Sequence, residues 1–133
     1  MRNPIPASLQ DLLTWEKKAI ALLGLTLEDG KPHVTPIWFE YVDGRFIINT
    51  LRGRVKDRVL KGKPWVSLCI LDQDDPNRYL QVQGEVVQET EKDALHQIRR
   101  LNEKYYGKYE FTVGPNDQRV TYIIEPRKST VDV

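Results

Sequence analysis

Cysteine and histidine are scarce in this sequence. Its 133 residues include one cysteine, Cys69, and two histidines, His33 and His96. A single thiol excludes an intramolecular disulfide, a Cys-x-x-Cys redox centre and a zinc site built on several thiolates. Two imidazoles leave too few ligands for a histidine-based metal cage, so we expect no metal site. A chain without disulfides has the reducing cytoplasm as its default compartment.

An excess of one charge and long apolar runs are also lacking. Twenty Lys and Arg residues balance nineteen Asp and Glu, which leaves a formal net charge of +1. A nearly neutral chain is not a general nucleic-acid binder, so any positive field must be local. No apolar run approaches the ~18 residues that span a bilayer, and the N-terminus lacks the pattern of a signal peptide. We therefore expect a soluble cytoplasmic protein that binds neither nucleic acid nor membranes.

The hydrophobic residues follow helical and strand periods along the whole chain. A length of 133 residues, 40% of them hydrophobic, predicts a single domain over residues 1–133. We expect helices over 9–18, 54–62 and 90–106, and strands over 19–28, 33–42, 45–51, 65–71, 79–88 and 119–125. Ser8 and Thr90 are the expected N-caps of the first and last helices.

Turns and prolines indicate how these strands are joined. Asp29-Gly30 and Asp43-Gly44 are two-residue hairpin signals. Pro36 inside a strand indicates a sheet edge, a bulge or an interrupted ladder. Consecutive hairpins predict an α+β, mainly β fold: a six-stranded antiparallel barrel, closed or half-open, with flanking helices. In the strand 65–71, which is apolar throughout, we expect Trp65, Ser67 and Cys69 to share a face within the core.

Basic residues gather between positions 52 and 63. They are Arg52, Arg54, Lys56, Arg58, Lys61 and Lys63, with Asp57 as the one acidic residue among them. Gly53 allows close backbone approach at a strand-to-helix junction, where helix N–H groups favour anions. Thr50, Arg54 and Lys56 therefore predict a phosphate-binding site. A solvated basic helix face and a nucleic-acid patch stay open as alternatives.

Side chains for acid–base or nucleophilic catalysis do not form a recognisable group. No Ser/His/Asp arrangement has a known spacing, and Asp72, Asp74 and Asp75 lack the glycine and ligand spacing of a calcium loop. The sequence identifies no catalytic residue, and hydrolysis by a side-chain nucleophile is not indicated.

Five segments, taken in order, resemble the pyridoxamine 5′-phosphate oxidase-like split-barrel flavoproteins. They are Asp-Gly-Lys-Pro-His-Val-Thr-Pro-Ile-Trp-Phe (29–39), Asp-Gly-Arg-Phe-Ile-Ile-Asn-Thr (43–50), Arg-Gly-Arg-Val-Lys (52–56), Lys-Pro-Trp-Val-Ser-Leu (63–68) and Tyr-Leu-Gln-Val-Gln-Gly-Glu-Val (79–86). The resemblance covers residues 8–126. The last segment and the helix after it are most similar to the branch that uses the deazaflavin coenzyme F420.

The resemblance implies a homodimer of six-stranded split barrels, with each cofactor in a cleft between subunits. Thr50, Arg54 and Lys56 match the family's cofactor-phosphate residues. Two strands supply the other cofactor-binding positions. The family's strand along the cofactor ring is matched by Val34, Thr35, Pro36 and Ile37. The strand that approaches the other side of the cofactor is matched by Tyr79 and Gln81.

Two departures bear on activity. Pyridoxamine 5′-phosphate oxidases resemble one another in a C-terminal extension with substrate-binding Arg and His residues. The segment 128–133 holds no such histidine, so oxidation of vitamin B6 compounds is not expected. In addition, Trp65 stands where many relatives carry arginine after the proline.

The resemblance favours a reductase that uses F420 to transfer hydride to a small conjugated substrate. FMN is the alternative cofactor, since both share a tricyclic ring, a ribityl chain and a phosphate. The F420 tail carries further carboxylates, for which Arg52 and Arg58 are the expected partners. A non-catalytic protein that binds a flavin or a tetrapyrrole is the alternative from a different class.

Overall fold

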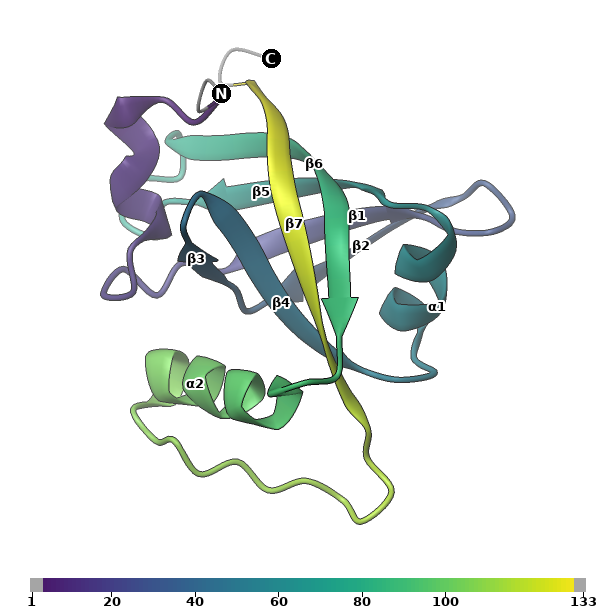
Figure 1. Cartoon of the computed structure of the whole chain (residues 1–133). Coiled ribbons are helices and arrows are strands. Elements are labelled where there is room, and N and C mark those ends of the chain that lie inside the picture. The colour runs from purple at the N-terminus through teal and green to yellow at the C-terminus, as the bar shows by residue number, and fades with distance from the viewer. Residues whose placement is uncertain (1–3, 131–133) are drawn as a thin grey trace.

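One curled antiparallel sheet forms the body of the protein. The computed structural model describes residues 4–130. The seven strands lie in the order β2-β1-β5-β6-β7-β4-β3, and every neighbouring pair is antiparallel (Figure 1). The strands are β1 (Ala21–Thr26), β2 (Pro32–Ile37), β3 (Glu40–Val42), β4 (Arg45–Leu51), β5 (Trp65–Leu71), β6 (Tyr79–Thr90) and β7 (Arg119–Thr130).

The two ends of this sheet lie close together. β2 and β3 stand at opposite ends of the strand order, yet only Trp38 and Phe39 separate them in the chain. Because this link allows at most ~11 Å between the Cα atoms of Ile37 and Glu40, the sheet must curl until its edges meet. The result is a barrel split between β2 and the β3–β4 hairpin, as expected. The predicted strand 33–42 is wrong in one respect: it breaks at these two residues, so residues 4–130 form seven strands.

Prolines stand where the sheet tolerates a missing N–H group. Pro36 lies on β2, which pairs with β1 alone, so the prediction of an edge strand is confirmed. Pro126 does not end the last strand as expected. It pairs with Gly84 beside a shift in the β6–β7 register, and β7 continues to Thr130. A bulge accommodates the proline without ending the ladder.

Three helices pack against this barrel. The predicted first helix is a 3-10 helix, η1 (Ala7–Leu13), which ends before residue 18 and begins at Pro6 without a side-chain cap. α1 (Val55–Gly62) packs against β1 and β4, and α2 (Ala94–Tyr106) packs against β4 and β7. Thr90 does not cap α2. The N-cap residue is Asp93, and the Thr90 hydroxyl accepts a hydrogen bond from the Lys92 amide, which precedes the helix. None of the described helices is long and apolar enough to cross a membrane.

The barrel interior holds the hydrophobic core. Fully buried side chains from several strands and η1 fill it, including Leu12, Leu23, Phe46, Leu68, Ile70, Leu80 and Ile124. The expected face of β5 is wrong. Val66, Leu68 and Ile70 point inward, whereas Trp65 is 57% exposed and Ser67 and Cys69 are half-buried on the outer face.

Candidate functional site

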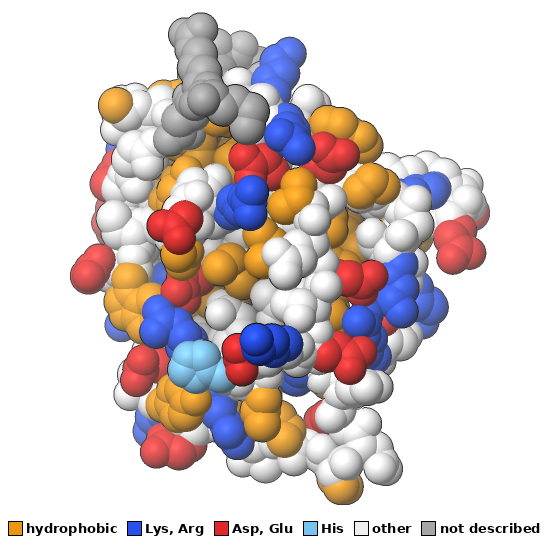
Figure 2. All heavy atoms as spheres, in the orientation of Figure 1, with side chains coloured by type: hydrophobic (Ala, Val, Ile, Leu, Met, Phe, Trp, Pro, Cys, Tyr) orange, Lys and Arg blue, Asp and Glu red, His pale blue; other side chains and the backbone are white. Residues whose placement is uncertain are grey.

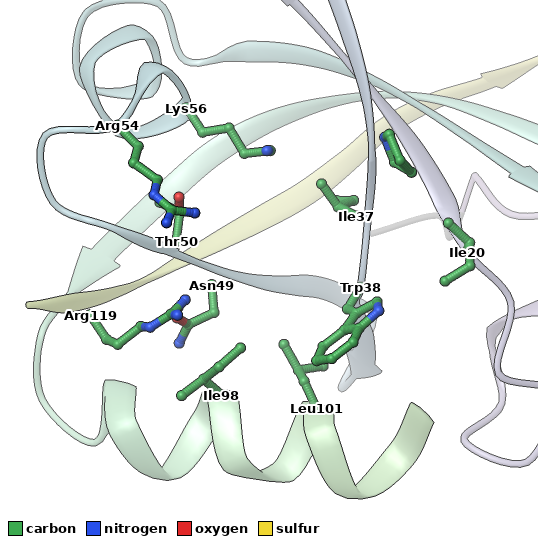
Figure 3. A pocket seen from close by; sticks show the side chains of 11 residues that line it. Ile20, Ile37, Trp38, Asn49, Thr50, Arg54, Lys56, Ile98, Leu101 and Arg119 are labelled. Carbon is green, nitrogen blue, oxygen red and sulfur yellow. The ribbon is translucent and has the colours of Figure 1, made fainter. Parts of the chain in front are cut away.

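A pocket lies in the split of the barrel. Its volume is about 290 Å³, at the lower end of the range for small-molecule sites. The end of β2, the end of β4, α1 and α2 surround it (Figure 3). The lining residues are Ile20, Pro36, Ile37, Trp38, Asn49, Thr50, Arg54, Lys56, Ile98, Leu101 and Arg119. Cationic side chains occupy one end of the pocket and apolar ones the other.

The cationic end is built at the β4–α1 junction. Thr50 is the penultimate residue of β4, and Arg54 is the N-cap residue of α1. Gly53, with φ of +89°, makes the turn between them. Burial and the positive charge of Arg54 lower the pKa of Lys56 below its usual value. Among residues 4–130, no carboxylate lies within ion-pair distance of Arg54, Lys56 or Arg119.

A buried carboxylate holds this junction in place. The Asp57 side chain, 3% exposed, accepts hydrogen bonds from the Gly53 amide (2.9 Å), Arg52 Nη1 (2.9 Å) and the Tyr122 hydroxyl (2.6 Å). Burial alone would raise the pKa of Asp57, but these hydrogen bonds outweigh it and the pKa is lowered. The hydrogen bonds of Asp57 therefore hold the turn between Thr50 and Arg54 in place.

Two residues of α2 fix the chain at the apolar end. Lys104, only 1% exposed, donates a 2.7 Å hydrogen bond to the Phe39 carbonyl, and burial lowers its pKa to about 8. The Tyr105 hydroxyl accepts from the Phe39 amide (3.2 Å) and donates to the Ala19 carbonyl (2.6 Å). The Tyr105 ring stacks on Trp38 with centroids 5.1 Å apart. These contacts hold the break between β2 and β3 so that Trp38 forms one wall of the pocket.

The structure brings together five of the nine residues expected to bind a cofactor. Pro36, Ile37, Thr50, Arg54 and Lys56 all line the pocket. The side chain of Thr35 is half-buried on the inner side of β2, and its Oγ1 is buried without a hydrogen-bond partner.

The other three expected residues lie on the outer face of the sheet. Val34 lines a separate hollow together with Trp65. Tyr79 and Gln81 pair with Leu71 and Cys69 on that same face and do not line the pocket. Within one chain these three side chains are therefore separated from the cationic end.

Sequence reasoning missed Arg119 and the apolar wall. Arg119 is the first residue of β7 and pairs with Leu51 in the sheet register. It follows the irregular segment 107–118, and no motif marks it. Ile98 and Leu101 recur with the helical period of α2 and are buried, but this periodicity does not distinguish a pocket wall from ordinary core. Asn49 lies within the expected strand 45–51, and no motif marks it either.

The remaining basic residues of 52–63 point away from the pocket. Arg52 pairs with Asp57, Glu89 and Glu91 at 2.6–2.9 Å. Arg58 donates to the Gly53 carbonyl, and Lys63 donates to the Leu27 carbonyl. These cations are dispersed and do not form one stripe. Figure 2 likewise shows basic and acidic side chains interspersed on the face in view.

Comparisons with known proteins agree with this geometry. A family profile described as pyridoxamine 5′-phosphate oxidase matches residues 8–130. No curated protein matches the chain significantly. Among solved structures, an F420 reductase is 28% identical with a TM-score of 0.83, and the match covers 96% of this chain and 100% of that one.

Two further solved structures share the fold. A conserved hypothetical protein from Mycobacterium tuberculosis is 25% identical with a TM-score of 0.70, over 97% of this chain and 86% of its own. A heme storage protein from Vibrio cholerae is 15% identical with a TM-score of 0.64, over 96% and 92%, which supports the fold alone. The split barrel and the profile match together show that the chain belongs to the pyridoxamine 5′-phosphate oxidase family.

Proposed function

We propose that this protein is an oxidoreductase that binds coenzyme F420 in the split of the barrel and reduces a small conjugated organic substrate. The observation that carries the proposal is the pocket itself, in which three cations that have no carboxylate partner among residues 4–130 adjoin an apolar wall. The likeness to an F420 reductase, 28% identical over almost the whole chain, supports the choice of cofactor.

The lining residues fit a flat ring with an anionic tail. Arg54 offers a guanidinium fork, Lys56 a point charge and Thr50 a hydroxyl, which is a donor set suited to phosphate. The start of α1 adds backbone N–H groups. Ile37, Trp38 and Leu101 provide the apolar surface that a tricyclic ring requires. When bound, reduced F420 supplies a hydride to the substrate.

The chain's own residues contribute binding, orientation and exclusion of water. Arg54 and Lys56 hold the phosphate, since their charges find no partner among the described side chains. Trp38, fixed by Tyr105, confines the ring from one side. Within the described pocket lining no carboxylate, imidazole or thiol is present, so none of these groups in the lining would donate the proton that accompanies hydride transfer.

The direct test is equilibrium binding. We expect the purified full-length protein to bind F420 with quenching of tryptophan fluorescence, because Trp38 lines the pocket. Lys56→Gln should raise the dissociation constant about 10- to 100-fold, the range for a charge-assisted hydrogen bond. Lys61→Gln, an exposed position at the other end of α1, is the matched control. Equal affinity in wild type and Lys56→Gln would contradict the phosphate assignment.

FMN is the competing cofactor and is separated by the same titration. The phosphate of FMN fits the cationic end equally well, so the Kd values for FMN and F420 decide which cofactor the protein uses. Sub-micromolar binding of FMN without measurable binding of F420 would replace F420 by FMN in the proposal. Steady-state oxidation of reduced F420 by a panel of enones, quinones and biliverdin then tests for reduction of a conjugated substrate.

A non-catalytic binding protein of the same fold, like the heme storage protein, is the second candidate. Heme iron needs an axial ligand such as His, Cys, Met or Tyr. Among the described residues that line the pocket, none is of these types. Binding of F420 without turnover of any acceptor in the panel would favour storage or transport of the cofactor over catalysis.

We also propose that the protein works as a homodimer with the cofactor between subunits. The outer face of β2, β1 and β5 carries Val34, Trp65 and Leu71, which are 61%, 57% and 40% exposed, and no charged side chain. A second copy seated on this face would cover the apolar surface. It would also allow Val34, Tyr79 and Gln81 of one subunit to reach a ligand held by the other.

A further inference from the structure

Arg119 stands in the pocket as a cation from a different strand. Arg119 belongs to β7 and pairs with Leu51 of β4. Side chains alternate between the two faces of a strand, so Leu51 and Asn49 share a face. Arg119 therefore lies on the same side of the sheet as Asn49. Figure 3 shows Arg119 beside Asn49 on the α2 side of β4, whereas Arg54 and Lys56 extend from the α1 side. The pocket therefore has two separate cationic points.

The Arg119 guanidinium is held but not neutralised. Its Nη1 donates to Asn49 Oδ1 at 3.4 Å, and its Cζ lies 5.1 Å from the centre of the Phe111 ring. Asn49 is fixed in turn by a 2.8 Å hydrogen bond from its Nδ2 to the Ala94 carbonyl. The Arg119 Nε is buried and has no hydrogen-bond partner within the described part of the chain.

The electrostatics of Arg119 favour an anion. Burial and the positive charge of Arg54 lower the pKa of Arg119, and only the negative charge of Asp117 acts in the other direction. An arginine remains charged even so. A buried, charged donor without a partner costs free energy, and an anionic ligand group beside it would remove that cost.

We propose that Arg119 is a specificity-determining residue that binds a second anionic group of the ligand, a carboxylate beyond the phosphate held by Arg54 and Lys56. This inference rests on the proposed function and assigns to Arg119 the role that the sequence pattern suggested for Arg52 and Arg58. Arg52 is committed to three carboxylates of the fold, and Arg58 lines a different pocket. The site thus selects a ligand with two separated anionic groups over one with a single phosphate.

The test compares three probes on the full-length protein. They are F420 with its glutamate tail, FMN, which has a phosphate and no carboxylate, and the deazaflavin alcohol that lacks both. We expect Arg119→Gln to raise the dissociation constant for tailed F420 about 10- to 100-fold, and to change the constants for the other two probes less than threefold. Arg119→Lys should recover part of the loss, because it restores the charge without the fork.

Arg45→Gln is the matched control. Arg45 lies on β4, pairs with Glu125 and does not line the pocket, so its loss should leave all three constants unchanged. Thermal unfolding of each variant checks that the fold is intact. Unchanged affinity of Arg119→Gln for tailed F420, or an equal loss for FMN, would overturn the role of Arg119. Wild-type protein that binds no F420 would instead overturn the proposed function, and this inference with it.

Discussion

At the scale of single residues, buried charges do the positioning in this protein. Asp57 holds the β4–α1 junction, and Lys104 holds the break between β2 and β3. Each is almost fully buried, and each contacts backbone groups next to a pocket residue. The pocket therefore depends on ionised groups that do not themselves line it.

Asp57→Asn should destabilise the fold by about 1.5–3 kcal/mol, the usual worth of hydrogen bonds to a charged group. The amide cannot accept from Gly53, Arg52 and Tyr122 as a carboxylate does. Urea unfolding measures the change. Asp43→Asn, in an exposed hairpin turn, is the control. Stability equal to that of wild type would show that the network adds nothing.

Lys104 should make stability depend on alkaline pH. Its pKa is about 8 in the folded protein and 10.5 as the ordinary value, so between these values the unfolded chain binds more protons. Stability therefore rises with pH across this window, by about 3 kcal/mol in total. Urea unfolding should show about 2 kcal/mol of this gain between pH 7 and pH 9.5 in wild type, but not in Lys104→Met. If the free energy of unfolding changed with pH equally in both proteins, the lowered pKa of Lys104 would be refuted.

At the scale of elements, the long β6–β7 ladder connects the two halves of the barrel. Its register shifts between Gln83 and Gly84 and again between Val86 and Gln88. Gly84 permits the close approach at the first shift, because a Cβ there would lie 2.5 Å from Ile124 Cγ2 and 3.3 Å from the Glu125 carbonyl oxygen. The bend at this point carries Pro126 within the strand.

Gly84→Ala should therefore cost about 1–3 kcal/mol of stability through overpacking. Gly62→Ala is the matched control, since nothing lies within 4 Å of a Cβ at that position. Thermal unfolding of the two variants measures the difference. A Gly84→Ala protein as stable as the control would mean that Ile124 moves aside without cost.

At the scale of the whole molecule, the uncharged outer face predicts self-association. Wild type should sediment at twice the chain mass, and Trp65→Glu should sediment as a monomer with weakened F420 binding, because a charge would be buried in the contact. Leu95→Glu, at an exposed apolar position on α2, should leave the dimer intact. A Trp65→Glu protein that still dimerises would place the contact elsewhere.

The sequence anticipates the hairpins and the β4–α1 junction better than it anticipates which face of a strand is buried or which distant residues make contact. Asp43-Gly44 and the residues 50–56 are local signals, and the structure has them where expected. The face of β5 was misassigned because a continuous apolar run hides which side is buried. Arg119 reaches the pocket through pairing with Leu51, 68 positions earlier, and spacing along one chain carries no trace of such a contact.

The two edges of the open sheet have a consequence for aggregation. An uncovered edge can template further chains into a fibril. Pro32 and Pro36 remove two amide donors from β2, and β3 is only three residues long. Neither edge provides a continuous ladder for an incoming strand. Concentrated protein should therefore stay free of cross-β material even when the ligand is stripped away.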